Sequence, residues 1–135
     1  MKCVFLDTNV IIDLLADRIP FSKDAERIFN LGKNKQLKLF VSAHSIVTVH
    51  YVLKKYMDEK KLRLVLTELV ECLEIIPVTK QVIDRSLTSK FTDFEDAIQY
   101  FTAISIADIS YIITRNIKDF KFAEIAVLAP DQFIV

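Results

Sequence analysis

Short apolar runs alternate along the chain with longer segments in which apolar residues recur every three or four positions. The short runs predict strands, and the longer segments predict amphipathic helices. Strands are expected at residues 3–6, 37–41, 75–78, 109–113 and 125–128. Helices are expected at residues 8–15, 22–31, 42–53, 61–73, 80–89 and 93–104. Strands separated by helices favour a three-layer α/β/α fold, with a mostly parallel central sheet of four to five strands.

The expected ends of these elements carry residues that commonly begin or end helices and strands. Ser, Thr and Asp side chains cap helices because their oxygens accept hydrogen bonds from free amides in the first turn. Candidate caps are Asp7 or Thr8, Ser22, and Ser42 or Ser45, and Asp93 opens the last helix. Gly32, the only glycine, is predicted to cap the C-terminus of the second helix. Pro77 suits the end or the edge of the third strand.

The composition predicts one soluble domain spanning residues 1–135. Apolar residues make up 52% of the chain, with one glycine and three prolines, which excludes a disordered protein. Charged residues interrupt every apolar stretch before it reaches membrane-spanning length, so no membrane partner is expected. Cys3 and Cys72 lie at no metal-like spacing and are expected to be buried, reduced thiols. A cytoplasmic location fits these features.

The 18 basic and 18 acidic residues cancel, so the total charge does not indicate a nucleic-acid partner. A local cluster can still create a charged site that the total hides. Ligands bind at the carboxyl ends of the strands in parallel α/β sheets, and polar side chains follow three of the expected strands. They are Asp7 after the first strand, Ser42 and Ser45 after the second, and Thr114, Arg115, Asn116 and Asp119 after the fourth.

A second group of acidic side chains begins the last expected helix. Asp93 and Asp96 are three residues apart, so both side chains can share one helical face. Taken singly, Asp7 fits either a helix cap or a functional carboxylate, and the helix dipole explains the other two aspartates. Brought together with Asp119 at one edge of the sheet, the carboxylates would repel each other unless a cation compensates them. Oxygen ligands favour Mg²⁺ or Mn²⁺ over Zn²⁺, and such ions commonly act on phosphates.

Other chemistries fit the sequence poorly. One glycine cannot form a glycine-rich phosphate loop, and no serine lies in a nucleophile-elbow pattern. His44 and His50 are six residues apart, which is not the spacing of a helical metal pair, so they are predicted to be polar helix-surface residues. A haloacid-dehalogenase-like phosphatase would also place an aspartate after the first strand. That chemistry requires a second aspartate two residues later, and Asn9 stands there.

Three segments, in order, resemble motifs of the PIN domain family. They are residues 5–10 (FLDTNV), residues 93–100 (DFEDAIQY) with Thr102 and Ala103, and residues 114–120 (TRNIKDF). The resemblance covers essentially the whole chain and implies a small parallel sheet between helices. Active members of this family are Mg²⁺- or Mn²⁺-dependent ribonucleases. Many are VapC-type toxins neutralised by an antitoxin, and many form dimers, so RNA, an antitoxin protein and a second copy of the chain are the implied partners.

The resemblance also implies roles for individual residues. Asp7 and Asp96 are expected to be catalytic, metal-binding carboxylates, and Asn116 occupies the last catalytic position. Asp93 is expected to add a metal-binding charge to the same pocket. Supporting roles are expected for Asn9, Ser45, Thr48, Thr114 and Asp119.

Thr48 departs from the family pattern, because active members usually carry a glutamate at this place in the helix after the second strand. Loss of a charged partner weakens metal binding by an expected factor of about 10–100. An alternative hypothesis is therefore a degenerate PIN domain that binds RNA or protein without cutting.

Overall fold

The computed structural model describes residues 1–133 of the chain. Its strands are β1 (Lys2–Leu6), β2 (Leu37–Ser42), β3 (Glu74–Ile76), β4 (Ile109–Ile113) and β5 (Ala126–Leu128). Its α-helices are α1 (Thr8–Leu15), α2 (Ser22–Lys33), α3 (Ala43–Leu53), α4 (Glu59–Val70), α5 (Lys80–Leu87) and α6 (Phe94–Ile104). Two short 3₁₀ helices, η1 (Ile117–Phe120) and η2 (Pro130–Gln132), follow β4 and β5 and were not predicted.

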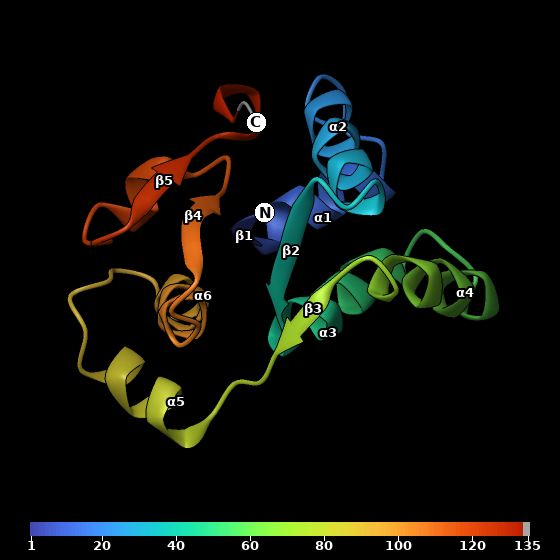
Figure 1. Ribbon diagram of the computed structural model, residues 1–135. Helices are drawn as coiled ribbons and strands as arrows, with labels where there is room; N and C mark the ends of the chain where they lie inside the picture. Colours follow the sequence, from blue (N-terminus) through green and yellow to red (C-terminus); the bar gives the residue numbers. More distant parts are fainter. Residues whose placement is uncertain (134–135) are drawn as a thin grey trace.

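The five strands form one sheet in the order β3-β2-β1-β4-β5, and every neighbouring pair is parallel. The chain runs outward from β1 through β2 to β3, and then returns to place β4 on the other side of β1 (Figure 1). The winding direction therefore changes between β1 and β4. In open parallel sheets, the crevice at this point is where ligands bind.

Alternate residues of β1 separate the interior into two cores, one on each face of the sheet. Val4 and Leu6 pack in the core formed with α1, α2, α3 and α4. Phe5 faces the opposite way, where it packs with Phe40, Ile112 and α6. Figure 1 shows α1 to α4 on one side of the sheet and α6 on the other. The predicted three-layer fold is thus confirmed.

Several predicted boundaries shift for local reasons. β3 ends at Ile76, before Pro77, which has no amide hydrogen for the strand ladder. α4 begins two residues earlier than predicted, because the Asp58 side chain caps it by accepting from the Lys61 amide at 3.3 Å. Ser22 does not cap α2; it is the first residue of the helix, and no side chain caps that end.

The prediction that both cysteines are buried is wrong. Cys3 and Cys72 are free thiols that are partly exposed rather than buried. Within residues 1–133, no helix has both the length and the hydropathy needed to cross a bilayer.

The sequence predicted that Gly32 caps the C-terminus of α2, and this prediction is wrong. The residue lies inside the helix, and Asn34 occupies the cap position. A Cβ atom at Gly32 would lie 2.8 Å from Leu39 Cγ and closer still to Leu39 Cδ1. The glycine therefore allows α2 to approach β2 closely, which explains its place in the sequence by packing.

Gly32→Ala should destabilise the protein by about 1–3 kcal/mol, because the new methyl group collides with the buried Leu39 side chain. Urea denaturation measures the loss. Gly32→Ala combined with Leu39→Val should recover part of it, since the smaller side chain makes room. A stability equal to that of the wild type in the single variant would contradict this packing role.

Candidate active site

Asp7 lies at the carboxyl end of β1, beside the end of β4. Its backbone amide donates to the Ile113 carbonyl at 3.0 Å, which extends the pairing of the two strands. Its Oδ1 caps α1 by accepting from the Thr8 amide at 2.7 Å, and its Oδ2 accepts from Thr114 Oγ1 at 2.8 Å. Asn9 Nδ2 also donates to Oδ2, at 3.4 Å. The side chain is 6% exposed, so Asp7 is a buried and firmly oriented carboxylate.

Four of the predicted site residues line one hollow of about 540 Å³ next to this point. Asp93 and Asp96 come from the start of α6, and Asn116 and Asp119 come from the segment after β4. Asp93 caps α6 by accepting from the Asp96 amide at 3.1 Å. Asp7 is not part of the lining of this hollow but is close enough for its charge to act on Asp96.

Two of these carboxyl groups, Asp7 and Asp96, have raised pKa values. Burial raises the pKa of Asp7 from 3.8 to about 6, although the hydrogen bonds from Thr114 and Thr8 oppose the shift. Partial burial, together with the charges of Asp7 and Asp93, raises the pKa of Asp96 from 3.8 to about 7. Burial and neighbouring acids therefore both disfavour the charged forms of Asp7 and Asp96.

The loop after β4 is joined to the start of α1 by a short series of hydrogen bonds. Asn9 Nδ2 donates to Thr114 Oγ1 at 3.3 Å, and Asn9 Oδ1 accepts from the Arg115 amide at 3.4 Å. Thr114 Oγ1 also accepts from the Asn116 amide at 3.0 Å. The predicted supporting residues Asn9 and Thr114 therefore position Asp7 and Asn116.

Ser45 belongs to a buried polar cluster where α1, α3 and α6 meet. Gln99 Nε2 donates to Thr8 Oγ1 and to Ser45 Oγ, each at 2.8 Å, and the two hydroxyl oxygens lie 2.8 Å apart. Gln99 Oε1 has no hydrogen-bond partner among residues 1–133, although the side chain is fully buried. Gln99 was not predicted from the sequence; the available signal was a polar residue within the apolar face of α6.

Thr48 lies on α3 and does not line the hollow. Its Oγ1 is 3.2 Å from His44 Nε2, and the same nitrogen is 3.3 Å from Glu95 Oε2 on α6. His44 is 41% exposed, as a surface residue should be, but it links two helices beside the carboxylates. No role was predicted for Glu95, which stands between Asp93 and Asp96 in the motif.

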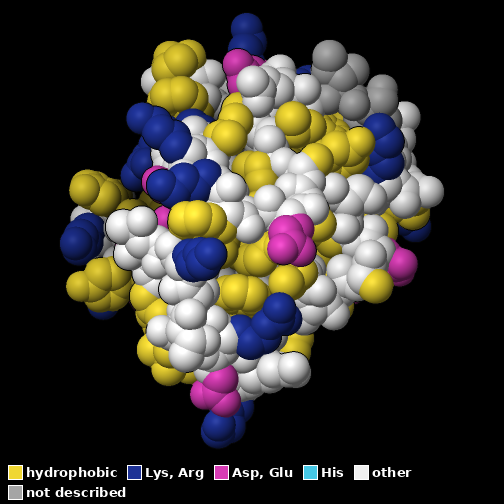
Figure 2. Space-filling model, turned by 90° about the vertical axis from the view of Figure 1, so that its left-hand side faces the viewer, with side chains coloured by type: hydrophobic (Ala, Val, Ile, Leu, Met, Phe, Trp, Pro, Cys, Tyr) yellow, Lys and Arg dark blue, Asp and Glu magenta, His cyan; other side chains and the backbone are white. Residues whose placement is uncertain are grey.

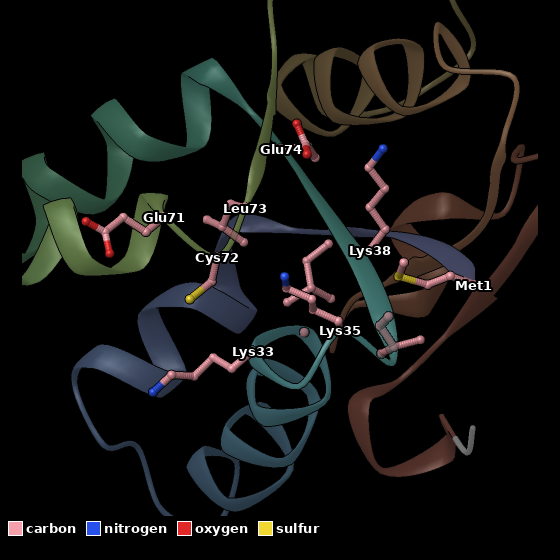
Figure 3. A pocket seen from close by; sticks show the side chains of 11 residues that line it. Met1, Lys33, Lys35, Lys38, Glu71, Cys72, Leu73 and Glu74 are labelled. Atoms are coloured by element: carbon pink, nitrogen blue, oxygen red, sulfur yellow. The ribbon is translucent and has the colours of Figure 1, made fainter.

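A second hollow, of about 490 Å³, lies at the amino ends of β1, β2 and β3. Lysine and glutamate side chains, including Lys33, Lys38 and Glu71, line it together (Figure 3). It contains none of the residues of the family motifs. This opposite edge of the sheet provides matched control positions for the carboxylates at the Asp7 edge.

The oxygen donors at the Asp7 edge fit a hard divalent cation with few protein ligands. Within residues 1–133, no three acidic, histidine or cysteine side chains are grouped closely enough to hold an ion by themselves. Mg²⁺ is commonly bound through one or two carboxylates and completes its shell with waters and substrate phosphates. Asp7, Asp96 and Asn116 offer such a set of oxygen donors.

Residues 3–118 match the family described as PIN domain. The chain belongs to the PIN domain family. Ribonuclease VapC1 of Aquifex aeolicus (strain VF5), a relative, is 33% identical over 135 residues, which cover 96% of this chain and 92% of the relative. The resemblance inferred from the three motifs is therefore confirmed.

Solved PIN structures share the fold. A toxin–antitoxin complex from Klebsiella pneumoniae contains a chain with 26% identity and a TM-score of 0.69, covering 94% of this chain and 97% of its own length. The structure of VapBC-1 from nontypeable Haemophilus influenzae contains a chain with 18% identity and a TM-score of 0.70, covering 97% of this chain and all of its own length. The parallel sheet with helices on both faces is thus the arrangement found in these PIN proteins.

Proposed function

We propose that the chain is a divalent-cation-dependent endoribonuclease of the PIN family and the toxin of a toxin–antitoxin pair. The observation that carries the proposal is the pairing of Asp7 with Asp96 at the crevice between β1 and β4. Burial raises the pKa of both carboxyl groups, and the charge of Asp7 raises the pKa of Asp96 further. The identity of 33% with a protein named ribonuclease VapC1, over nearly the full chain, supports RNA as the substrate.

In this proposal, Asp7, Asp96 and Asn116 hold Mg²⁺ or Mn²⁺, and Asp93 adds charge to the pocket. The cation, when bound, supplies a Lewis acid for the scissile phosphate and a more acidic water. Asp7 keeps a single orientation because its Oδ1 accepts from the Thr8 amide and its Oδ2 accepts from the Thr114 hydroxyl. Asp96, which is less buried, orients the attacking water.

Lysines near the acids provide contacts for the RNA backbone. Lys118 and Lys121 line the same hollow as Asp93 and Asp96. Lys and Arg groups are also spread among hydrophobic side chains on the face that carries α5 and β5 (Figure 2). Such cations bind phosphates without regard to sequence, so they support RNA binding while leaving the preferred sequence open.

An antitoxin partner is supported by the similarity to a chain of the Klebsiella pneumoniae toxin–antitoxin complex. A homodimer and a cytoplasmic location remain predictions from the sequence. Size measurement of the chain alone, and of the chain co-expressed with the product of the adjacent reading frame, tests the two partners separately.

Cleavage should depend on the cation. RNA incubated with the protein and Mg²⁺ or Mn²⁺ should be cut, EDTA should stop the reaction, and excess Mn²⁺ should restore it. Gel electrophoresis of the RNA measures each condition. Equal cleavage in EDTA would show that the carboxylates do not act through a metal ion.

A second candidate function is binding without cleavage, and Thr48 in place of the family glutamate is the observation that favours it. In that case the protein should retain RNA in a gel-shift assay and leave it intact at every Mn²⁺ concentration. Cleavage at any Mn²⁺ concentration, lost with EDTA, would exclude binding without cleavage.

A further inference from the structure

Gln99 joins three helices next to the candidate site through one buried amide group. It lies on α6, three residues after Asp96, and its side chain is fully buried. Its Nε2 donates one hydrogen bond to Thr8 Oγ1 on α1 and one to Ser45 Oγ on α3, each at 2.8 Å. The two hydroxyl oxygens are themselves 2.8 Å apart, so the three groups form a closed triangle. Both amide hydrogens of Gln99 are therefore used to hold α6 against α1 and α3.

The same triangle is linked to both candidate carboxylates. The Thr8 backbone amide donates to Asp7 Oδ1 at 2.7 Å, so Thr8 accepts from Gln99 through its hydroxyl and holds Asp7 through its amide. Asp96 lies one helical turn before Gln99, and residues three apart on a helix are neighbours on its surface. Within residues 1–133, the bond from Gln99 to Thr8 is the one side-chain hydrogen bond that joins α1 to α6. It therefore connects the helix that Asp7 caps to the helix that carries Asp96.

Packing alone does not explain an amide at this position of α6. The neighbours of Gln99 in the helix include Ala97, Ile98 and Ala103, which are buried and apolar. Gln99 Oε1 is buried and has no hydrogen-bond partner in the described part of the chain. A buried acceptor without a partner lowers stability. An apolar side chain of the same length would avoid this cost, so we look to the two donated hydrogen bonds for the role of Gln99.

We propose that Gln99 is a positioning residue that sets the separation of Asp7 and Asp96 for a divalent cation. It does so by fixing the Thr8 hydroxyl, and it makes no contact with the cation itself. The inference rests on the proposed function, because it assumes that the two carboxylates bind the cation. Side chains that orient the ligands of a metal ion commonly change its affinity by about 10–100-fold when they are removed.

Calorimetric titration of Mn²⁺ into the metal-free protein tests the proposal without measuring cleavage, and urea denaturation in EDTA measures stability in parallel. Gln99→Met keeps the length of the side chain and removes both donated hydrogen bonds. It should raise the Kd for Mn²⁺ by about 10–100-fold. The protein should still fold, because the change also removes the unpaired Oε1. An unchanged Kd in this variant would overturn the proposal.

Thr102→Val is a matched control on the same helix. Thr102 is also fully buried on α6, and its Oγ1 has no hydrogen-bond partner among residues 1–133. The change removes a buried polar group without breaking a bond to α1, so the Kd for Mn²⁺ should equal that of the wild type. If Thr102→Val raises the Kd as much as Gln99→Met does, the packing of α6 is responsible and the positioning role is overturned.

Two variants of Thr8 test the other end of the hydrogen bond. Thr8→Ser keeps the hydroxyl group and should bind Mn²⁺ nearly as the wild type does. Thr8→Val keeps the shape of the side chain without the hydroxyl and should raise the Kd as Gln99→Met does. Combining Thr8→Val with Gln99→Met should cause little further loss of affinity, because both changes break the same contact. Losses that add fully in the double variant would show that Gln99 does not act through Thr8.

Asp7→Asn distinguishes this inference from the proposed function. If Asp7→Asn loses Mn²⁺ binding and Gln99→Met binds as the wild type does, Gln99 is not a positioning residue, and the proposed cation site stands. If the wild type binds no Mn²⁺, both are overturned. We expect weaker binding in Asp7→Asn, Gln99→Met and Thr8→Val, and the affinity of the wild type in Thr102→Val.

Discussion

Asp7→Asn should make the metal-free protein more stable at pH 7.5. Burial raises the pKa of Asp7 to about 6, so the folded state favours the protonated carboxyl group. The stability that this group contributes is fully present below its unfolded pKa of 3.8 and is lost as the pH rises through about 6. Asparagine carries no charge, and its single amide oxygen can still accept from the Thr8 amide, while its NH2 group replaces the oxygen that accepted from Thr114. The variant should therefore avoid a cost on the order of 1–3 kcal/mol at pH 7.5.

Urea denaturation in EDTA at pH 4 and at pH 7.5 measures this effect. The free energy of unfolding of Asp7→Asn should exceed that of the wild type clearly at pH 7.5 and hardly at all at pH 4. Asp108→Asn is a matched control, because Asp108 is exposed and lies just before β4, at the other edge of the sheet. An advantage that does not change with pH would argue against a desolvated carboxylate at Asp7.

Arg115→Met should destabilise the protein by about 3–5 kcal/mol, because it leaves a buried carboxylate without its main partner. Arg115 binds Asp13 through Nε at 2.5 Å and through Nη2 at 3.0 Å, and Asp13 is 1% exposed. The guanidinium group also lies 4.0 Å from the centre of the Phe21 ring. Among residues 1–133, Arg18 is the remaining cation paired with Asp13, with its Nη1 at 3.9 Å. Thermal unfolding measures the loss.

Two further variants test whether the unpaired charge of Asp13 causes this loss of stability. Arg63→Met removes an exposed ion pair with Glu59 and should leave the unfolding temperature almost unchanged. Replacing both members, as Asp13→Leu with Arg115→Met, removes the unpaired charge and should recover much of the stability. If the double variant is less stable than Arg115→Met alone, the ion pair is not the source of the loss.

The fold was predictable because its signals are local. The apolar runs at residues 3–6 and 109–113 match β1 and β4, and Asp7 caps α1 as expected. Gly32 shows where local rules fail. Its position near a helix end favours a cap, whereas its actual constraint comes from Leu39, seven residues later on a strand that packs against the helix.

Part of the candidate site was also predictable from local sequence signals. Asp93, Asp96, Asn116 and Asp119 follow from strand ends and helix starts, and they line one hollow. Other features depend on the packing of three helices that the sequence does not place relative to each other. His44 contacts Glu95, 51 residues away in the chain, and no periodicity in the sequence indicates this pairing.

Asp7 and Asp96 are proposed to form together a site that cuts RNA. The most direct measurement is single-turnover RNA cleavage with Mn²⁺ by the wild type, Asp7→Asn, Asp96→Asn and the control Asp108→Asn. All four proteins should be folded by circular dichroism. The wild type and Asp108→Asn should cut RNA at similar rates, and the two site variants should be slower by more than about 100-fold, the upper end of the range for lost metal-site partners. Cleavage at the wild-type rate by Asp7→Asn and Asp96→Asn would contradict the claim.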